Sequence, residues 1–173
     1  LIAANLACTG VFRPIVTTNF DDLALAGFWN LPPNEAYSEP YVIYDPRTVR
    51  LAHIRLGEDT PIIIKAHGHY TQYGVGIVEA QIRQLAPFVK RIIRSFGSPR
   101  VGYIVVGCSG AWQDGVIDTL KDRRLTRGKT IYWFYREKVP DLKKLHPLRE
   151  LAENSDVCFI RCDDPDYLFL KLW

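Results

Sequence analysis

The stretch Pro61-Ile62-Ile63-Ile64-Lys65-Ala66 decides the fold of this 173-residue chain. It is almost continuously apolar and rich in isoleucine, which is typical of a strand in a parallel sheet whose two faces are both covered by helices. The polar sequence His67-Gly68-His69 follows it directly. Because ligands of such sheets bind outside the carboxyl ends of the strands, a site is expected where this strand ends.

Further apolar runs alternate with helical patterns along the rest of the chain. The expected strands lie at 14–18, 101–106, 131–135 and 157–160, with a short one near 41–44. The expected helices lie at 1–9, 22–28, 113–124, 141–154 and 165–173. An apolar stripe from Val78 to Phe96 predicts one more, which Pro87 should kink or split. This alternation predicts an α/β protein, a three-layer Rossmann-like fold with a mostly parallel sheet.

Length and composition indicate one domain over residues 1–173. Hydrophobic residues make up 47% of the chain, and the net charge of +3 is too small to indicate nucleic-acid or membrane binding by long-range attraction. The four cysteines form no C-x-x-C pair, so a reducing compartment is expected, and no apolar run reaches the roughly 20 residues of a membrane helix. We therefore expect a cytoplasmic protein. The absence of Met indicates a fragment of a longer chain.

Three polar segments follow expected strands and should meet at one edge of the sheet. They are Thr18-Asn19-Phe20-Asp21, His67-Gly68-His69 and Gly107-Cys108-Ser109-Gly110. The last of these is glycine-rich and precedes a helix, which suits a phosphate or a ribose as well as a plain tight turn. Their convergence predicts a binding site.

Each polar residue also has an ordinary structural interpretation. Asn19 and Asp21 suit a turn and a helix N-cap, which are the commonest uses of these residues between a strand and a helix. His67 could be a buried histidine with satisfied hydrogen bonds at a strand end, and His69 is expected to face solvent.

All three segments resemble motifs of the sirtuin family. Thr18-Asn19-Phe20-Asp21-Asp22-Leu23 resembles the motif whose Asn and Asp line the nicotinamide-ribose pocket, and Lys65-Ala66-His67-Gly68 resembles the catalytic His-Gly motif. Val106-Gly107-Cys108-Ser109 is similar to the family's Gly-x-Ser turn, which holds the phosphate and adenosine-ribose end of the dinucleotide. The acidic turn and helix at 162–168 also match, so the resemblance runs from about Gly10 to the end.

The interval from Gly68 to Val106 distinguishes branches of that family. It contains neither the four-cysteine zinc module nor the Phe-Gly-Glu loop of the deacylases. Its apolar-striped helix is instead similar to the sirtuin-like domains of bacterial anti-phage defence proteins, which hydrolyse NAD. The family's first strand and Gly-Ala-Gly turn would precede Leu1. The resemblance implies an NAD+ glycohydrolase without a metal, acting as a defence effector with other domains or subunits of an oligomeric assembly.

The resemblance also implies a role for each site residue. His67 would be the base that takes a proton from a ribose hydroxyl or water, and Asn19 would orient ribose and water. Thr18 would contribute to NAD+ binding, and Asp21 would meet the nicotinamide carboxamide. The other end of NAD+ would be held by Gly107, Ser109 and Gly110.

Other functional classes remain open. Val106 to Ala111 approximates the nucleophile elbow of a serine hydrolase, with Ser109 as nucleophile and Asp141 and His146 downstream. His67 and His69 could share a metal ion with Asp21, Asp114 or Cys108. The domain could also be a non-catalytic module for nucleotide or ADP-ribose binding or for assembly.

A basic cluster lies between two of the expected elements. Its members are Lys121, Arg123, Arg124, Arg127 and Lys129. Basic residues at the carboxyl end of a helix offset the negative end of its dipole, so these residues are expected to cover a helix end, and no direct nucleic-acid binding is expected.

Overall fold

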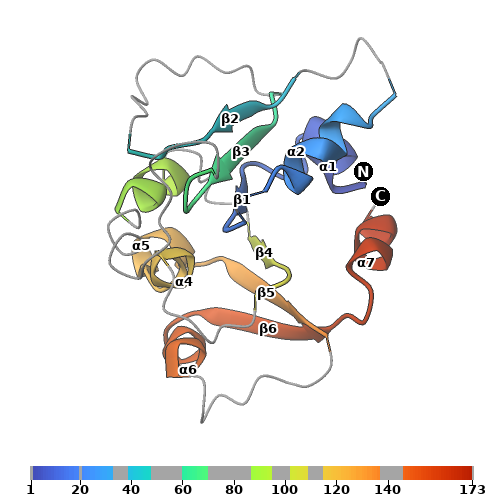
Figure 1. The fold of residues 1–173 in the computed structure, drawn as a ribbon. Helices are drawn as coiled ribbons and strands as arrows, with labels where there is room; N and C mark the ends of the chain where they lie inside the picture. Colours follow the sequence, from blue (N-terminus) through green and yellow to red (C-terminus); the bar gives the residue numbers. More distant parts are fainter. Residues whose placement is uncertain are drawn as a thin grey trace. The chain divides into compact units, whose positions relative to one another are not determined.

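The computed structural model describes residues 2–19, 21–32, 39–47, 60–69, 87–94, 102–108, 115–136 and 146–172. These ranges contain helices and two three-stranded parallel sheets, so the predicted α/β class is confirmed (Figure 1). The chain divides into two compact units, Leu1–Phe96 with Trp173 and Gly97–Leu172. Within the described ranges no helix is long and apolar enough to cross a membrane.

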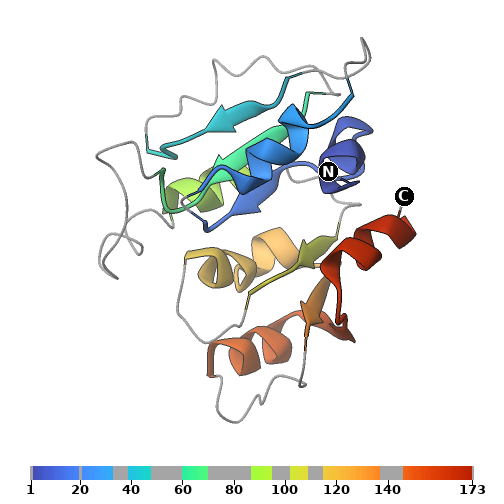
Figure 2. The same ribbon diagram turned by 45° about the vertical axis from the view of Figure 1, so that its right-hand side comes forward.

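The first unit is built on a sheet with the strand order β1-β3-β2 (Figures 1 and 2). The strands are β1 (Ile15–Thr17), β3 (Ile62–Lys65) and β2 (Tyr41–Ile43). Both outer strands pair with β3 in parallel, Thr17 opposite Lys65 and Tyr41 opposite Ile62. All four residues of β3 are buried, as its apolar sequence predicts.

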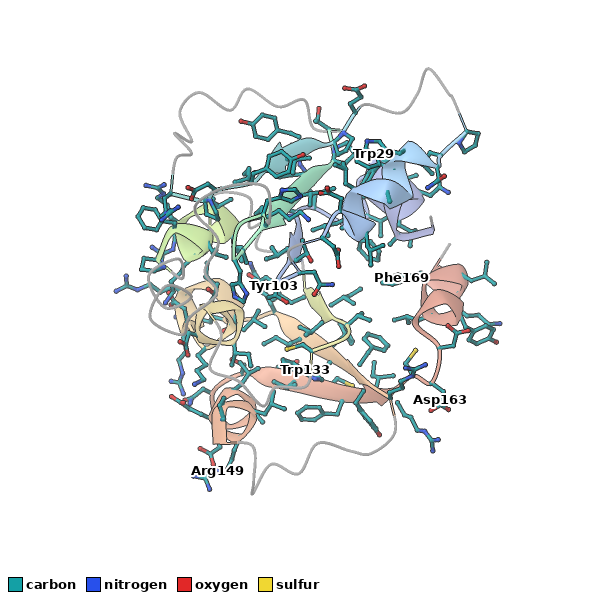
Figure 3. All side chains as sticks on the ribbon, viewed as in Figure 1. Trp29, Tyr103, Trp133, Arg149, Asp163 and Phe169 are labelled. Carbon is teal, nitrogen blue, oxygen red and sulfur yellow. The ribbon has the colours of Figure 1, made fainter. Side chains whose placement is uncertain are left out.

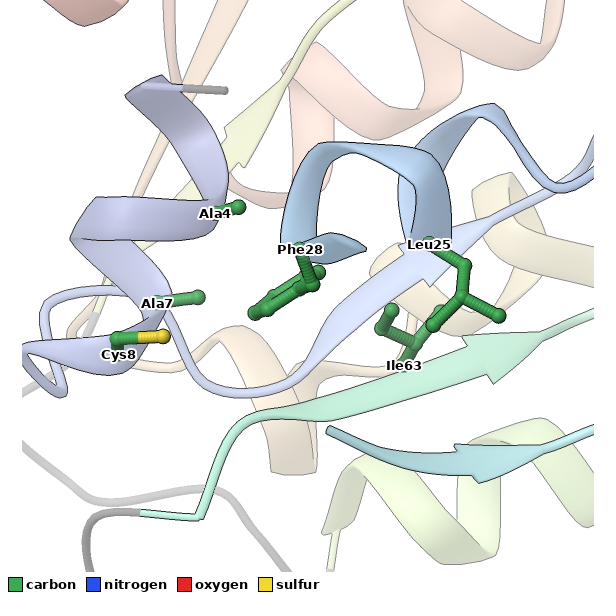
Figure 4. Packing of buried hydrophobic residues seen from close by; sticks show 6 residues of the cluster. All are labelled: Ala4, Ala7, Cys8, Leu25, Phe28 and Ile63. Carbon is green, nitrogen blue, oxygen red and sulfur yellow. The ribbon is translucent and has the colours of Figure 1, made fainter. Parts of the chain in front are cut away.

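Helices pack against both faces of β3. On one face, Ile63 contacts α1 (Ile2–Cys8) and α2 (Leu23–Trp29) in a cluster of Ala4, Ala7, Cys8, Leu25, Phe28 and Ile63 (Figure 4). On the other face, Ile62 and Ile64 pack with Ile92 of the helical segment 87–94. Successive strand residues point to opposite faces, which explains why Ile62, Ile63 and Ile64 are all apolar. The rest of the predicted stripe from Val78 to Phe96 lies outside the described residues.

The second unit has a parallel sheet with the order β4-β5-β6. Its strands are β4 (Tyr103–Val105), β5 (Thr130–Tyr135) and β6 (Asp156–Arg161), and its helices are α4 (Gly115–Leu120), α5 (Arg123–Thr126), α6 (His146–Asn154) and α7 (Pro165–Leu172). The fully buried Trp133 of β5, labelled in Figure 3, packs with Ile117 of α4 and Leu148 of α6. This face of the sheet therefore carries the core of the unit.

One predicted helix is wrong in its extent. The pattern over 113–124 predicts a single helix, whereas the structure has α4 and then α5. Asp122 is the reason, because its side chain accepts a hydrogen bond from the backbone N–H of Arg124 and caps α5. An N-cap begins a new helix instead of continuing the previous one.

Candidate functional site at the ends of β1 and β3

Asn19 and His67 lie at the same edge of the first sheet. Thr17 is paired with Lys65, and beyond this pair the backbone N–H of Ala66 donates to the carbonyl of Thr17 over 2.8 Å. Asn19 and His67 each follow two residues after a member of that pair. The parallel pairing of β1 with β3 therefore brings these two predicted site residues to neighbouring strand ends.

Short-range hydrogen bonds shape the segment after β1. The hydroxyl of Thr17 accepts from the backbone N–H of Asn19 over 3.1 Å, and a carboxylate oxygen of Asp21 accepts from the N–H of Leu23 over 3.1 Å. Asp21 thus forms the turn before α2, as predicted, but the N-cap position of α2 belongs to Asp22 and not to Asp21. Asn19 and Asp21 are exposed, and Thr18 is half-buried.

The turn after β3 is tight and buried. Gly68 has a φ of 89°, a conformation that glycine adopts without a Cβ clash, and its N–H donates to the carbonyl of Lys65 over 3.1 Å. His67 is only 8% exposed, and its Nε2 atom is buried. The imidazole therefore lies in protein surroundings at the strand end, whereas Asn19 is open to solvent.

The prediction that His69 faces solvent is wrong. His69 is only 5% exposed, and its Nε2 donates to Oδ1 of Asp22 over 2.9 Å. The ring of Tyr44 meets the imidazole edge to face, with 5.1 Å between the ring centroids. The carboxylate and the aromatic ring make a buried position favourable for this histidine.

The same carboxylate oxygen also faces a buried lysine. Nζ of Lys65 lies 3.5 Å from Oδ1 of Asp22, and the Lys65 side chain is fully buried, while that of Asp22 is 27% exposed. An ammonium removed from water needs an opposite charge nearby, and Asp22 supplies it. We call Asp22, Lys65, His69 and Tyr44 the Asp22 cluster.

Sequence reasoning missed the Asp22 cluster, although two features could have indicated it. One is a lysine at the end of an otherwise apolar strand, where burial demands a carboxylate. The other is the second aspartate of the Asp21-Asp22 pair. Neither feature shows that Lys65 and Asp22 are partners, because their contact depends on which strand lies beside β3.

The third predicted segment belongs to the second unit. Gly107 follows β4 with a φ of 71°, which favours glycine, and half-buried Cys108 packs against the core of that unit. Ser109 and Gly110 lie outside the described residues. Asp114, Asp141 and the side chain of His146 also lie outside them, so the serine-hydrolase alternative stays a prediction.

The metal alternative and the basic cluster involve residues that the structure describes in part. Across the ranges that the structure describes, no three His, Cys, Asp or Glu side chains come together as metal ligands. Within the basic cluster, Lys121 pairs with Glu150 over 2.7 Å and Arg123 donates to the Asn154 side chain over 2.8 Å. Lys129 lies over the Tyr103 ring.

Comparison of the chain with models of known protein families, with curated proteins and with solved structures gives no match. The assignment of a function therefore depends on the residues themselves.

Proposed function

We propose that the chain is an NAD+ hydrolase that cleaves the bond between nicotinamide and ribose at the edge where β1 and β3 end. The observation that carries the proposal is the pairing of Thr17 with Lys65, which sets Asn19 and His67 at neighbouring strand ends. An amide and an imidazole are the two groups that the proposed chemistry requires there. The proposal includes the three-layer Rossmann-like fold and a site for NAD+ as substrate.

The proposed reaction needs a base and an orienting group more than it needs a strong acid. The bond between the ribose C1′ and the pyridinium nitrogen breaks, and its electron pair neutralises the leaving nicotinamide. Water forms the new bond at C1′, and its proton passes to the imidazole of His67, which acts as the base. The transition state is oxocarbenium-like, as in glycoside hydrolysis, so positioned dipoles and carboxylates stabilise it.

Asn19 and Asp21 are open to this substrate. The exposed amide of Asn19 would orient the ribose and the attacking water. Asp21 uses one carboxylate oxygen for the turn at Leu23, and the other would accept from the nicotinamide carboxamide. By the resemblance to sirtuin-like domains, Thr18 of the same segment would also contribute to NAD+ binding.

Nicotinamide release tests the proposal directly. The protein is incubated with NAD+, and products are separated by chromatography for the wild type, His67→Ala and Asn19→Ala. Loss of a general base lowers rates by roughly 10²–10⁴-fold, so His67→Ala should fall in that range. Asp118→Asn on the exposed surface of α4 is the control and should keep the wild-type rate.

Two results would count against the proposal. Wild-type protein that releases no nicotinamide would refute the hydrolase activity. Undiminished turnover in both His67→Ala and Asn19→Ala would refute the assignment of these residues.

A further inference from the structure

Two adjacent aspartates, Asp21 and Asp22, have different tasks at the start of α2. Asp21 is exposed and uses its carboxylate locally, for the backbone N–H of Leu23. Asp22 occupies the N-cap position of α2, but its side chain makes no capping hydrogen bond. Its carboxylate is directed instead at the buried groups of the β3 end.

Asp22 holds both ends of the turn that carries His67. Lys65 precedes His67 by two residues and His69 follows it by two. Both side chains approach the same oxygen, Oδ1 of Asp22, Nζ of Lys65 at 3.5 Å and Nε2 of His69 at 2.9 Å. The segment 65–69 is therefore closed into a loop by one carboxylate, with His67 at its middle.

The surroundings of Asp22 favour both of its contacts. Lys65 is fully buried and His69 nearly so, which lowers the local dielectric and strengthens both interactions. Tyr44, just after β2, packs on the His69 imidazole and restricts its orientation. Asp22 thus connects the start of α2 to the end of β3 and to His69, and His69 in turn contacts Tyr44 after β2.

We propose that Asp22 is a positioning residue that fixes the imidazole of His67 by holding Lys65 and His69. The inference rests on the proposed function for the task of His67, but its structural part stands on the contacts alone. Asp22 acts through the turn and does not touch the substrate in this mechanism.

The variant Asp22→Asn separates charge from hydrogen bonding. Asparagine keeps an oxygen that can accept from His69 but removes the charge that faces Lys65. The matched control is Asp118→Asn, where Nζ of Lys121 lies at a similar 3.6 Å but the aspartate is 49% exposed and Lys121 has Glu150 as a second partner. Both variants change one Asp to Asn beside a lysine, and only one of these lysines is fully buried.

Two readouts are measured on the same preparations. Histidine side-chain NMR spectra without NAD+ should show displaced His67 and His69 signals in Asp22→Asn and unchanged signals in Asp118→Asn. In nicotinamide release, kcat of Asp22→Asn should fall by about 10- to 100-fold with KM within about twofold, because a misplaced catalytic group costs rate more than binding.

The outcomes separate the two proposals. His67 signals that do not move in folded Asp22→Asn overturn the positioning role, and so does an unchanged kcat. If the wild type releases no nicotinamide, the proposed function fails, while the NMR comparison still decides the positioning role. If Asp22→Asn does not fold, the double variant Asp22→Asn with Lys65→Met replaces it, because this variant also removes the buried ammonium that would lack a carboxylate. Unmoved His67 signals in the double variant overturn the positioning role of Asp22.

Discussion

Lys65 ends a strand that otherwise consists of isoleucine, and the burial of its ammonium calls for a carboxylate nearby. The apolar run around it predicts the strand and its burial, and both are confirmed. The same pattern cannot reveal that Asp22 is the partner, because that contact depends on β1 lying beside β3. The prediction for His69 fails for the same reason, since local sequence does not show Tyr44 and Asp22 around it.

We predict that the two partners of this ion pair differ in their effect on stability. Asp22→Asn should lower the free energy of unfolding by about 3 kcal/mol, because it leaves the fully buried ammonium of Lys65 without its carboxylate. Lys65→Met should lower the free energy of unfolding by less, because methionine suits the apolar surroundings. In this variant Asp22 still accepts the hydrogen bond from His69 and is still partly exposed to solvent. Urea unfolding of both variants checks the order, and a larger loss in Lys65→Met would contradict it.

Asp45 allows a pH-dependent prediction at a single residue. Hydrogen bonds from Arg47, at 2.8–3.2 Å, hold the pKa of the Asp45 carboxyl below its usual range. A lowered folded-state pKa stabilises the fold above the unfolded pKa of about 3.9, and this contribution is lost as the pH falls through the folded value. Arg47 is 41% exposed, so the pair contributes under about 1 kcal/mol.

Arg47→Gln should therefore destabilise the protein slightly at pH 7, and the difference should shrink as the pH falls below the unfolded pKa of about 3.9. Thermal unfolding of the wild type and of Arg47→Gln, measured from pH 7 down to a pH below that unfolded pKa, checks the prediction. A difference between the two proteins that grows as the pH falls would have the wrong sign.

At the scale of elements, sequence patterns locate most strands and helices closely but miss the division of one helix. The runs at 131–135 and 157–160 correspond to β5 and β6 within one residue at each end, because strands are rich in β-branched and aromatic residues. The single helix expected over 113–124 fails at Asp122, where one capping hydrogen bond outweighs a continuous helical pattern. The strand order β1-β3-β2 also could not be read from the sequence, because it depends on contacts between distant segments.

Gly102 gives a test at the β4–β5 pair. A Cβ at this position would lie 2.7 Å from the backbone carbonyl oxygen of Thr130, which cannot move without shifting β5. Gly102→Ala should cost roughly 1–3 kcal/mol and speed amide hydrogen exchange in 103–105.

The control for this prediction is Gly128→Ala. Gly128 has a φ of 71°, and a Cβ added there would meet no other atom within 4 Å. Alanine at this position therefore costs roughly 1–2 kcal/mol of backbone strain without touching β4. Equal exchange in 103–105 for the two variants would show that the close approach to Thr130 does not limit β4.

At the scale of the whole molecule, the rule that sites form at the carboxyl ends of parallel strands applies within one sheet. Asn19 and His67 follow paired strands of the first unit, so the sequence could predict that they share an edge. Gly107 follows a strand of a second sheet, in the other unit. The single domain expected over 1–173 and the joint site with Ser109 stay predictions, since the pairing rule applies only between strands of the same sheet.

The charge distribution leads to a final prediction, that the chain does not bind nucleic acid appreciably. The net charge is only +3, and three members of the basic cluster, Lys121, Arg123 and Lys129, already contact Glu150, Asn154 and Tyr103. The cluster is therefore poorly placed to replace counterions on a phosphate backbone. Fluorescence anisotropy with a labelled duplex should give a Kd weaker than roughly 100 µM at physiological salt, beyond the usual non-specific range. Micromolar binding that weakens steeply with salt would contradict this prediction. If that binding were also lost in the double variant Arg124→Ala with Arg127→Ala, the surface around α5 would be a nucleic-acid interface, because both arginines are exposed there.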